Sequence, residues 1–283
     1  MRRTSPDHRG LQHGGGVCCC GDGELVRGRE DPHPQPVDPA VADHRVGLAC
    51  RAVAAPTLLY VTQCAPYRDG LAGVHGVLDQ SAIALHEIAD ATGLADRRVG
   101  DVTELTVDEL AAARVVALFT IGETPWSPDQ RATLLSNVRA GHTAIVAIHA
   151  ATDSCYGWSD YGRLVGARFD GHPWTQEIDL EVTGRDHPAT RHLGATWRVR
   201  DEVYQFRDLR PDAQVLLRVP VEQLDLDAPG ARRPDFGFPL SWCFTEQGGR
   251  VFSTTLGHFA AAWESPTYLQ HVAGGLAWAC GAD

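Results

Sequence analysis

The sequence of 283 residues contains no lysine, one methionine at position 1 and one asparagine, Asn137. Schiff-base catalysis, a pyridoxal phosphate anchor and a Walker-type phosphate loop each require a lysine amine. The absence of lysine therefore excludes these three kinds of chemistry.

Long apolar runs and a basic surface are also missing. No apolar run approaches the roughly 20 residues that a membrane span needs, and no apolar segment follows Arg2 and Arg3 as it would in a secretory leader. The formal net charge is -11, and residues 1–55 contribute none of it because their arginines and acids balance. An acidic domain without a basic stripe argues against nucleic acid or an anionic membrane as partner. We expect a soluble cytoplasmic protein with a small-molecule substrate. Formation of a homo-oligomer is left as an alternative.

The eight cysteines do not form a recognisable metal or disulfide pattern. Four lie in the first 50 residues, three of them adjacent, and the other four are scattered at Cys64, Cys155, Cys243 and Cys280. Neither set has the spacing of a zinc knuckle or of a small disulfide scaffold. We expect free thiols in a reducing compartment. Because Cys155 lies near His149, a catalytic thiolate at this position is an alternative.

Residues 1–55 are rich in Gly, Pro, His and Arg and show no hydrophobic period. Such a segment cannot bury enough apolar surface to offset its chain entropy, so we predict a disordered tail. A misassigned translation start, with the true start at Val46 or Val53, is an alternative. One domain is expected over residues 56–283.

Strands and helices alternate in the first half of this domain. Ser127 and Gln130 around Pro128, like Thr106 with Glu109, have the pattern of helix N-caps. This alternation predicts an α/β fold with an open, mainly parallel sheet and helices on both faces. We expect strands at 57–62, 98–102, 115–120 and 143–148, and helices at 78–92, after 106, and at 128–139.

The second half is richer in strands. Residues 239–245 and 250–254 flank Gly248 and Gly249 and predict a hairpin. Ser265 and Pro266 open a last helix that extends to about Ala279. Further strands are expected at 176–182, 197–199, 204–206 and 213–219.

The strand at 143–148 is apolar throughout, as is typical of a strand buried on both faces, and it stops at His149. Open α/β sheets bind their ligands at the carboxyl ends of such strands. The position resembles the turn that presents the nucleophile of hydrolases, but no Ser or Cys occupies it. His149 is therefore a candidate catalytic residue. The alternative is a histidine that only caps the strand.

Other histidines also lie at the ends of predicted elements. His172, His187 and His258 are each next to Gly or Pro, and we expect them to converge with His149 on one crevice. His258 follows a strand, where the histidine partner of a nucleophile commonly lies in α/β hydrolases. His75 lies in the loop after the first strand and is a candidate site neighbour. The alternatives are turn residues for His172 and His187 and a surface position for His75.

Acids and aromatic residues accompany these histidines. Asp153 lies four residues after His149, Glu123 follows the strand at 115–120, and Asp201 and Glu202 are paired acids. The paired acids could instead form an ion pair with Arg198 or Arg200. Small-molecule sites are usually lined by a few such polar groups and by aromatic platforms. Candidate platforms are Trp126, Tyr156, Trp158, Trp174, Tyr204 and Trp242.

Several blocks together resemble the ThuA-like (trehalose utilisation) family. They are H-A-A-T-D, G-A-R-F-D-G-H-P, D-H-P-A-T-R-H-L, D-E-V-Y-Q-F, P-L-S-W, G-G-R-V-F-S-T-T-L-G-H and G-G-L-A-W-A-C-G, in this order between about Thr57 and Gly281. The resemblance implies a flavodoxin-like fold of the class I glutamine amidotransferase kind and a role in bacterial catabolism of trehalose, sucrose or their 3-keto derivatives. An amidotransferase needs Cys where this chain has His149, so glutaminase activity is not expected. The first loop, Gln63 to Tyr67, lacks a histidine that many relatives have, and His75 could compensate.

We therefore expect a hydrolase, lyase or isomerase that acts on a sugar. His149 and His258 are predicted to transfer protons, oriented by Asp153 or Glu202. A divalent metal held by His149, His172 or His258 could equally polarise a keto-sugar carbonyl. The alternative function is a sugar-binding or regulatory module without catalysis. The predicted sugar-binding residues are Glu123, His172, Trp174, Tyr204, His75 and Trp242.

Overall fold

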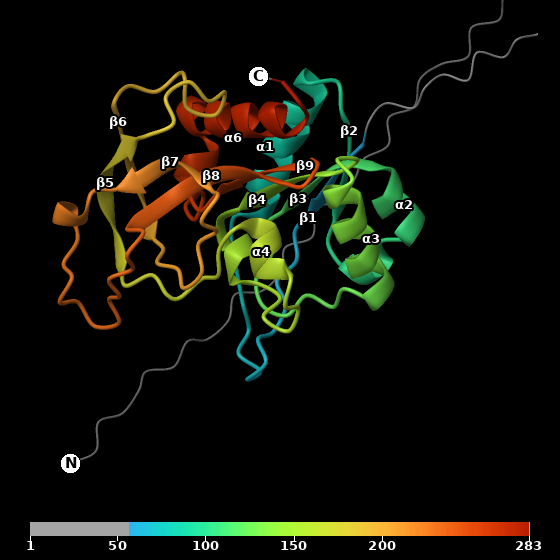
Figure 1. Cartoon of the computed structure of the whole chain (residues 1–283), viewed down its shortest axis with the longest axis horizontal. Coiled ribbons are helices and arrows are strands. Elements are labelled where there is room, and N and C mark those ends of the chain that lie inside the picture. The colour runs from blue at the N-terminus through green and yellow to red at the C-terminus, as the bar shows by residue number, and fades with distance from the viewer. Residues whose placement is uncertain (1–56, 283) are drawn as a thin grey trace, which may run out of the picture. The chain divides into compact units, whose positions relative to one another are not determined.

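A nine-stranded mixed sheet organises the part of the chain that the computed structural model describes, residues 57–282 (Figure 1). The strand order is β2-β1-β3-β4-β9-β8-β7-β5-β6. The predicted disordered tail and the alternative starts at Val46 and Val53 lie outside these residues.

The first five strands in this order are parallel to one another: β2 (Ala95–Val99), β1 (Thr57–Val61), β3 (Ala113–Leu118), β4 (Ala144–Ile148) and β9 (Gly249–Thr254). The central strand β4 is buried at every position, as its apolar sequence predicts. An order that reverses between β1 and β3 is that of flavodoxin-like sheets, in which ligands bind at the carboxyl ends beside the reversal. This edge of the sheet carries the candidate site.

Helices cover both faces of the sheet, as predicted. Figure 1 shows α1 and α6 together on one face and α3 and α4 on the other. The α-helices are α1 (Leu78–Ala91), α2 (Val107–Ala112), α3 (Pro128–Arg139), α4 (Tyr161–Val165), α5 (Ala260–Trp263) and α6 (Pro266–Ala279). Short 3₁₀ helices are η1 (Val102–Glu104), η2 (His149–Asp153) and η3 (Val221–Gln223).

The predicted N-caps are present. Thr106 opens α2 and Ser127 opens α3, each by a reciprocal capping box with the residue three positions later. Ser265 accepts a hydrogen bond from the Tyr268 amide at the start of α6. These side chains satisfy amides that a helix leaves without partners in its first turn.

The second half of the sheet is antiparallel and consists of β8 (Phe238–Glu246), β7 (Gln214–Val219), β5 (Trp174–Val182) and β6 (Thr196–Val203). The predicted strand at 197–199 is part of β6, which continues to Val203 across its charged residues, whereas the predicted strand at 204–206 was wrong, because only an isolated bridge from Phe206 to Phe169 lies there. β6 pairs with β5 alone and is an edge strand. One of its faces meets solvent, so charges there do not interrupt it.

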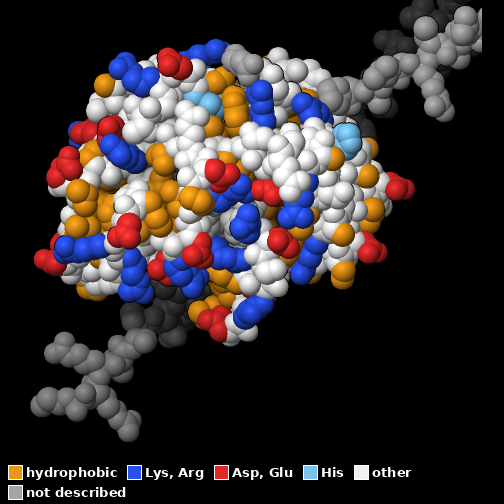
Figure 2. Space-filling model, in the orientation of Figure 1, with side chains coloured by type: hydrophobic (Ala, Val, Ile, Leu, Met, Phe, Trp, Pro, Cys, Tyr) orange, Lys and Arg blue, Asp and Glu red, His pale blue; other side chains and the backbone are white. Residues whose placement is uncertain are grey.

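The face in Figure 2 carries arginines and acids side by side rather than in separate patches. Among residues 57–282, no helix has both the length and the apolar character for crossing a membrane.

Candidate active site at the carboxyl ends of the parallel strands

Three histidines from distant parts of the chain meet at the carboxyl edge of the sheet. His75 lies in the loop between β1 and α1, His149 directly follows β4, and His258 follows β9. The His258 Nδ1 atom is 3.3 Å from the His149 Nε2 atom. The His75 ring centroid is 4.7 Å from that of His149 and 5.7 Å from that of His258. The expected convergence of His149 and His258 is confirmed, and His75 is a site neighbour.

His149 is held in one tautomer by its surroundings. Its φ of 47° lies in the left-handed region, which is costly for a residue other than glycine and is found at functional turns. The Nδ1 atom lies 2.8 Å from the carbonyl oxygen of Thr255, which can only accept, so Nδ1 carries the hydrogen. Burial, followed by the neighbouring His75, lowers the pKa of His149 well below its ordinary value. The ring is therefore neutral at pH 7, and its Nε2 atom accepts a hydrogen bond from the Tyr204 hydroxyl at 3.1 Å.

Glu202, near the end of β6, is the carboxylate that contacts the histidines. Its Oε2 atom is 3.3 Å from His258 Nδ1 and 3.7 Å from His149 Nε2. Its Oε1 atom is 3.6 Å from His172 Nδ1. The alternative of an ion pair with Arg198 is wrong, because that arginine pairs with Glu177 and Asp179 on β5.

Asp201 fixes the backbone that carries His258. Its carboxylate accepts hydrogen bonds from the amides of Gly257 at 2.8 Å, Glu202 at 2.9 Å and His258 at 3.4 Å. Burial raises the pKa of Asp201 to about 7, against the effect of these amides. Asp201 therefore acts on the site through the backbone of its neighbours.

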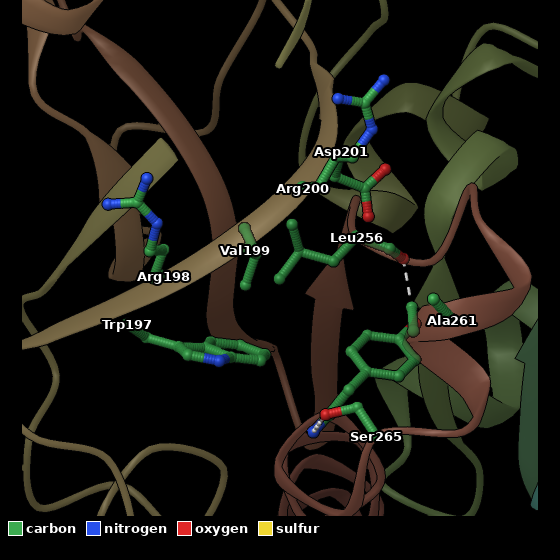
Figure 3. Close-up of a pocket in the computed structure, with 10 residues that line it drawn as sticks. Trp197, Arg198, Val199, Arg200, Asp201, Leu256, Ala261 and Ser265 are labelled. Atoms are coloured by element: carbon green, nitrogen blue, oxygen red, sulfur yellow. Dashed lines mark hydrogen bonds between the residues drawn. The ribbon is translucent and has the colours of Figure 1, made fainter. Parts of the chain in front are cut away.

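A cavity of about 200 Å³ lies beside Asp201, between β6 and the segment that leads into α6. Figure 3 shows Trp197 and Val199 extending to one side of β6 and Arg198 and Arg200 to the other. Successive side chains of a strand alternate between its two faces. The Asp201 side chain therefore lies on the same side of β6 as Trp197 and Val199. Glu202 points to the opposite side, toward the histidines.

Asp153 does not orient His149. Its two carboxylate oxygens accept hydrogen bonds from the hydroxyls of Tyr67 and Tyr156, both at 2.5 Å. Burial raises the pKa of Asp153. Of the two predicted orienting carboxylates, Glu202 contacts the imidazoles and Asp153 contacts tyrosines. Sequence reasoning did not identify Tyr67, whose loop carries no motif that indicates this role.

Tyr204 and His172 complete the wall of the site. The Tyr204 ring is stacked against His172 with centroids 5.7 Å apart and lies 5.1 Å from the His149 ring. Tyr204 is buried, whereas 43% of the His172 side chain is exposed. Both residues were predicted to bind a sugar: His172 is exposed enough to reach a ligand, whereas the buried Tyr204 lies behind it.

Two predicted tryptophan platforms lie elsewhere. Trp242 is fully buried in β8, where its Nε1 donates to the carbonyl of Val165. Its prediction as a sugar platform was wrong, because no face of the ring can reach a ligand. Trp174 is also buried, packs edge-on against Phe238, and donates to the carbonyl of Asp225. Its ring contact and its hydrogen bond are thus made with residues outside the histidine group.

Glu123 and His187 also lie apart from the histidines. Glu123 forms an ion pair with Arg68 at 3.2 Å and accepts a hydrogen bond from the Gly157 amide. The His187 ring packs against Phe252 and Trp278, and its Nδ1 accepts a hydrogen bond from the Ala189 amide. The expected convergence of His187 was therefore wrong, and its turn alternative holds.

Cys155 has the properties of a structural thiol. It is buried, and its Sγ atom lies 2.9 Å from the Thr124 hydroxyl. Burial raises the pKa of the Cys155 thiol to about 11. A catalytic cysteine needs a lowered pKa, so the thiolate alternative was wrong.

The residues that could hold a metal differ in one member from the predicted set. One nitrogen from each of His75, His149 and His258 lies within 4.8 Å of the others, and His172 does not belong to this group among the residues described. His172 instead faces Glu202. The arrangement can transfer protons through imidazoles and a carboxylate, or bind a cation with three imidazole nitrogens.

Comparison with solved structures supports this fold. A ThuA-like protein from Bacteroides uniformis has a TM-score of 0.63 at 19% identity, covering 82% of this chain and 95% of that chain. A ThuA-like protein from Parabacteroides merdae has a TM-score of 0.62 at 19% identity, covering 80% and 90%. A cytoplasmic protein from Salmonella typhimurium has a TM-score of 0.53 at 13% identity, covering 78% and 98%.

The sequence itself gives a family match. No curated protein sequence matches the chain. The model of the ThuA family, described as trehalose utilisation, matches residues 69–279, which is most of the domain. The chain therefore belongs to the ThuA family.

Proposed function

We propose that the protein is a cytoplasmic enzyme of carbohydrate catabolism that acts on a disaccharide such as trehalose, or on its 3-keto derivative, at the histidine site. Family membership supports the substrate class. The observation that carries the proposal of catalysis is the contact between Glu202 Oε2 and His258 Nδ1 at 3.3 Å. A carboxylate in this position fixes the tautomer of an imidazole and makes its other nitrogen a proton acceptor.

His258 is the proton carrier in this proposal. Its side chain is 32% exposed, whereas that of His149 is fully buried and has both nitrogens engaged. His258 can therefore reach a sugar, and His149 holds the His258 ring in position. His172 and His75 would bind sugar hydroxyls, with Tyr204 supporting His172 from behind.

Hydrolysis and eliminative cleavage of the glycosidic bond both use such a group. In elimination from a 3-keto sugar, His258 would take the proton from C2, the C1–O bond would break as the C1=C2 bond forms, and the proton would pass to the departing oxygen. Placing an acid and base at such a step contributes about 10²–10⁴-fold in rate.

The test is a mass-spectrometric screen of the full-length protein with trehalose, sucrose and their 3-keto derivatives. We expect turnover of at least one sugar, and a loss of about 10²-fold or more in His258→Gln with an unchanged melting temperature. His86→Gln is the matched control, because His86 is exposed on α1 and pairs with Asp96. No turnover of any of these sugars by the parent, or full activity in His258→Gln, would contradict the proposal.

A second candidate is a sugar-binding or regulatory module without catalysis. The complete burial of His149 favours it, since one of the two predicted proton carriers cannot touch a ligand. Calorimetry that shows affinity for a sugar, together with no conversion of that sugar over days, would select this candidate.

A further inference from the structure

We propose that His75, His149 and His258, with Glu202 beside them, form a binding site for one divalent transition metal ion, for which Zn²⁺ fits best. The inference concerns the site of the proposed function, but metal binding can be measured without any sugar. It also replaces the predicted ligand set, since His75 takes the place of His172.

Two of the distances between the donor atoms of His149, His258 and Glu202 match the edges of a zinc tetrahedron. Zn–N bonds of about 2.0–2.1 Å place two ligand atoms of a tetrahedral site about 3.3–3.4 Å apart. His258 Nδ1 lies 3.3 Å from His149 Nε2 and 3.3 Å from Glu202 Oε2. The third edge, from Glu202 Oε2 to His149 Nε2, is 3.7 Å. Two imidazoles and a carboxylate thus form one face of such a polyhedron.

A second observation that favours a bound ion comes from His75. Its Nε2 atom is buried and has no hydrogen-bond partner among residues 57–282. Buried polar atoms in native proteins nearly always have a partner, and an exception suggests an ion or another missing group. One nitrogen of His75 lies within 4.8 Å of the donor nitrogens of the other two histidines, so an ion between the three rings would provide that partner.

The surroundings of His149 are those of a metal ligand. Its Nδ1 hydrogen is held by the Thr255 carbonyl at 2.8 Å, so the lone pair is on Nε2, which lies 3.3 Å from His258 Nδ1 and also accepts from the Tyr204 hydroxyl. A metal-binding histidine usually donates its other N–H to a carbonyl or carboxylate in this way. Three nitrogens and a carboxylate oxygen form a donor set for Zn²⁺ rather than for Mg²⁺, which prefers oxygen.

A bound ion would change the roles in the proposed reaction. Coordination through Nδ1 removes the hydrogen that His258 shares with Glu202. Held by the three histidines and Glu202, a divalent ion would supply Lewis-acid chemistry to a substrate carbonyl.

The experiment uses the full-length protein, stripped with a chelator, dialysed, and titrated with Zn²⁺ alone by calorimetry, with elemental analysis of the dialysed complex. Residues 1–55 contain histidines and cysteines that can also bind Zn²⁺. The readout is therefore a difference between variants. His75→Ala and Glu202→Gln are compared with the parent and with the exposed control His86→Ala, and near-ultraviolet circular dichroism checks their folding.

We expect the parent and His86→Ala to bind one equivalent of Zn²⁺ more than His75→Ala, or to bind it at least about 100-fold more tightly, the upper range for loss of a supporting residue. Mg²⁺ should not compete. Co²⁺ bound at the site should show d–d absorption without the thiolate band that the cysteines would give. Equal stoichiometry and affinity in parent and folded His75→Ala would overturn the proposal. If His75→Ala does not fold, the comparison with Glu202→Gln decides by the same criterion.

Metal binding and sugar turnover can fail separately. Zn²⁺ binding that requires His75, with no sugar converted, contradicts the proposed function alone. If the parent converts a sugar but calorimetry finds no Zn²⁺ binding that requires His75, the result contradicts the metal site alone.

Discussion

The buried histidine of α6 provides a prediction that depends on packing alone. His271 has no exposed surface. Its Nδ1 lies 2.8 Å from the carbonyl of Ala189 and its Nε2 lies 3.1 Å from the Thr254 hydroxyl. The carbonyl can only accept, so Nδ1 carries the hydrogen and Nε2 accepts from Thr254. The pocket thus fits the neutral ring, and burial lowers the pKa of His271 to about 3.

The sign of the pH effect follows from this lowered pKa. Between pH 6.5 and about 3 the unfolded chain binds a proton at His271 and the folded chain does not, so the free energy of unfolding falls as the pH falls through this window. The slope from one such residue approaches about 1.4 kcal/mol per pH unit. At pH 4.5 the loss from His271 is therefore about 2–3 kcal/mol relative to pH 7.5.

Urea unfolding of the parent and of His271→Gln at pH 7.5, 6.5, 5.5 and 4.5 measures this contribution. Glutamine can donate to Ala189 and accept from Thr254, and we expect it to cost about 1–2 kcal/mol at pH 7.5. The difference between the two proteins should shrink or reverse toward pH 4.5. Other buried histidines that do not act on His271, such as His149, affect both proteins alike and cancel. Parallel pH curves for parent and variant would refute the argument.

Three further substitutions test the assignments around the site. Asp201→Ala leaves the Gly257 amide buried without its acceptor, so we expect a loss of about 1–3 kcal/mol in urea unfolding and reduced sugar turnover; unchanged turnover would contradict the role given to Asp201. Trp242→Ala should lower the free energy of unfolding by about 3–5 kcal/mol, because the whole ring is in the core, whereas a change below about 1 kcal/mol would restore it as a surface platform. Cys155→Ser should retain full turnover with at most a small loss of melting temperature, and abolished activity in a folded variant would revive the thiolate mechanism.

The parallel half of the fold was predictable because its signals are local. The runs that became β1, β3 and β4 are apolar and β-branched, and a run of this kind indicates a strand buried on both faces. Thr106 and Ser127 marked the starts of α2 and α3 because capping depends on residues three positions apart. These parts needed no knowledge of the tertiary structure.

The bounds of the two edge strands could not be predicted from the sequence. The prediction began β2 at residue 98, although it extends over Ala95–Val99, and limited β6 to residues 197–199, although it extends over Thr196–Val203. Both strands contain adjacent charged residues. An edge strand has one free side and exposed faces, so it tolerates such residues, and no hydrophobic period reports it.

The histidines of the site were partly predictable for a topological reason. Parallel strands end at one edge of a sheet, so polar residues that directly follow such strands meet there. This rule placed His149 and His258 correctly. It failed for His187, which follows no parallel strand. For Trp242, the residue type alone did not indicate that the side chain is buried in the core.

The assignment of the orienting carboxylate shows where sequence spacing stops being informative. Asp153 is four residues from His149, yet its oxygens contact two tyrosines, and Glu202 comes to the imidazoles from the antiparallel half of the sheet. Only the pairing of strands across the sheet determines that approach. A single sequence does not report such pairing, whereas it does report where each strand ends.

The paired acids of β6 make the geometry of the site depend on the register of this strand. Asp201 faces the Gly257 amide, and Glu202, on the other face, contacts His258. A strand alternates its side chains with a period of two, so a shift of one residue would move each of these carboxylates to the opposite face of the strand. One carboxylate therefore fixes the backbone of His258 while its neighbour fixes the ring. The full pairing of β6 with β5, from Trp174 opposite Val203 to Glu181 opposite Thr196, holds both in place.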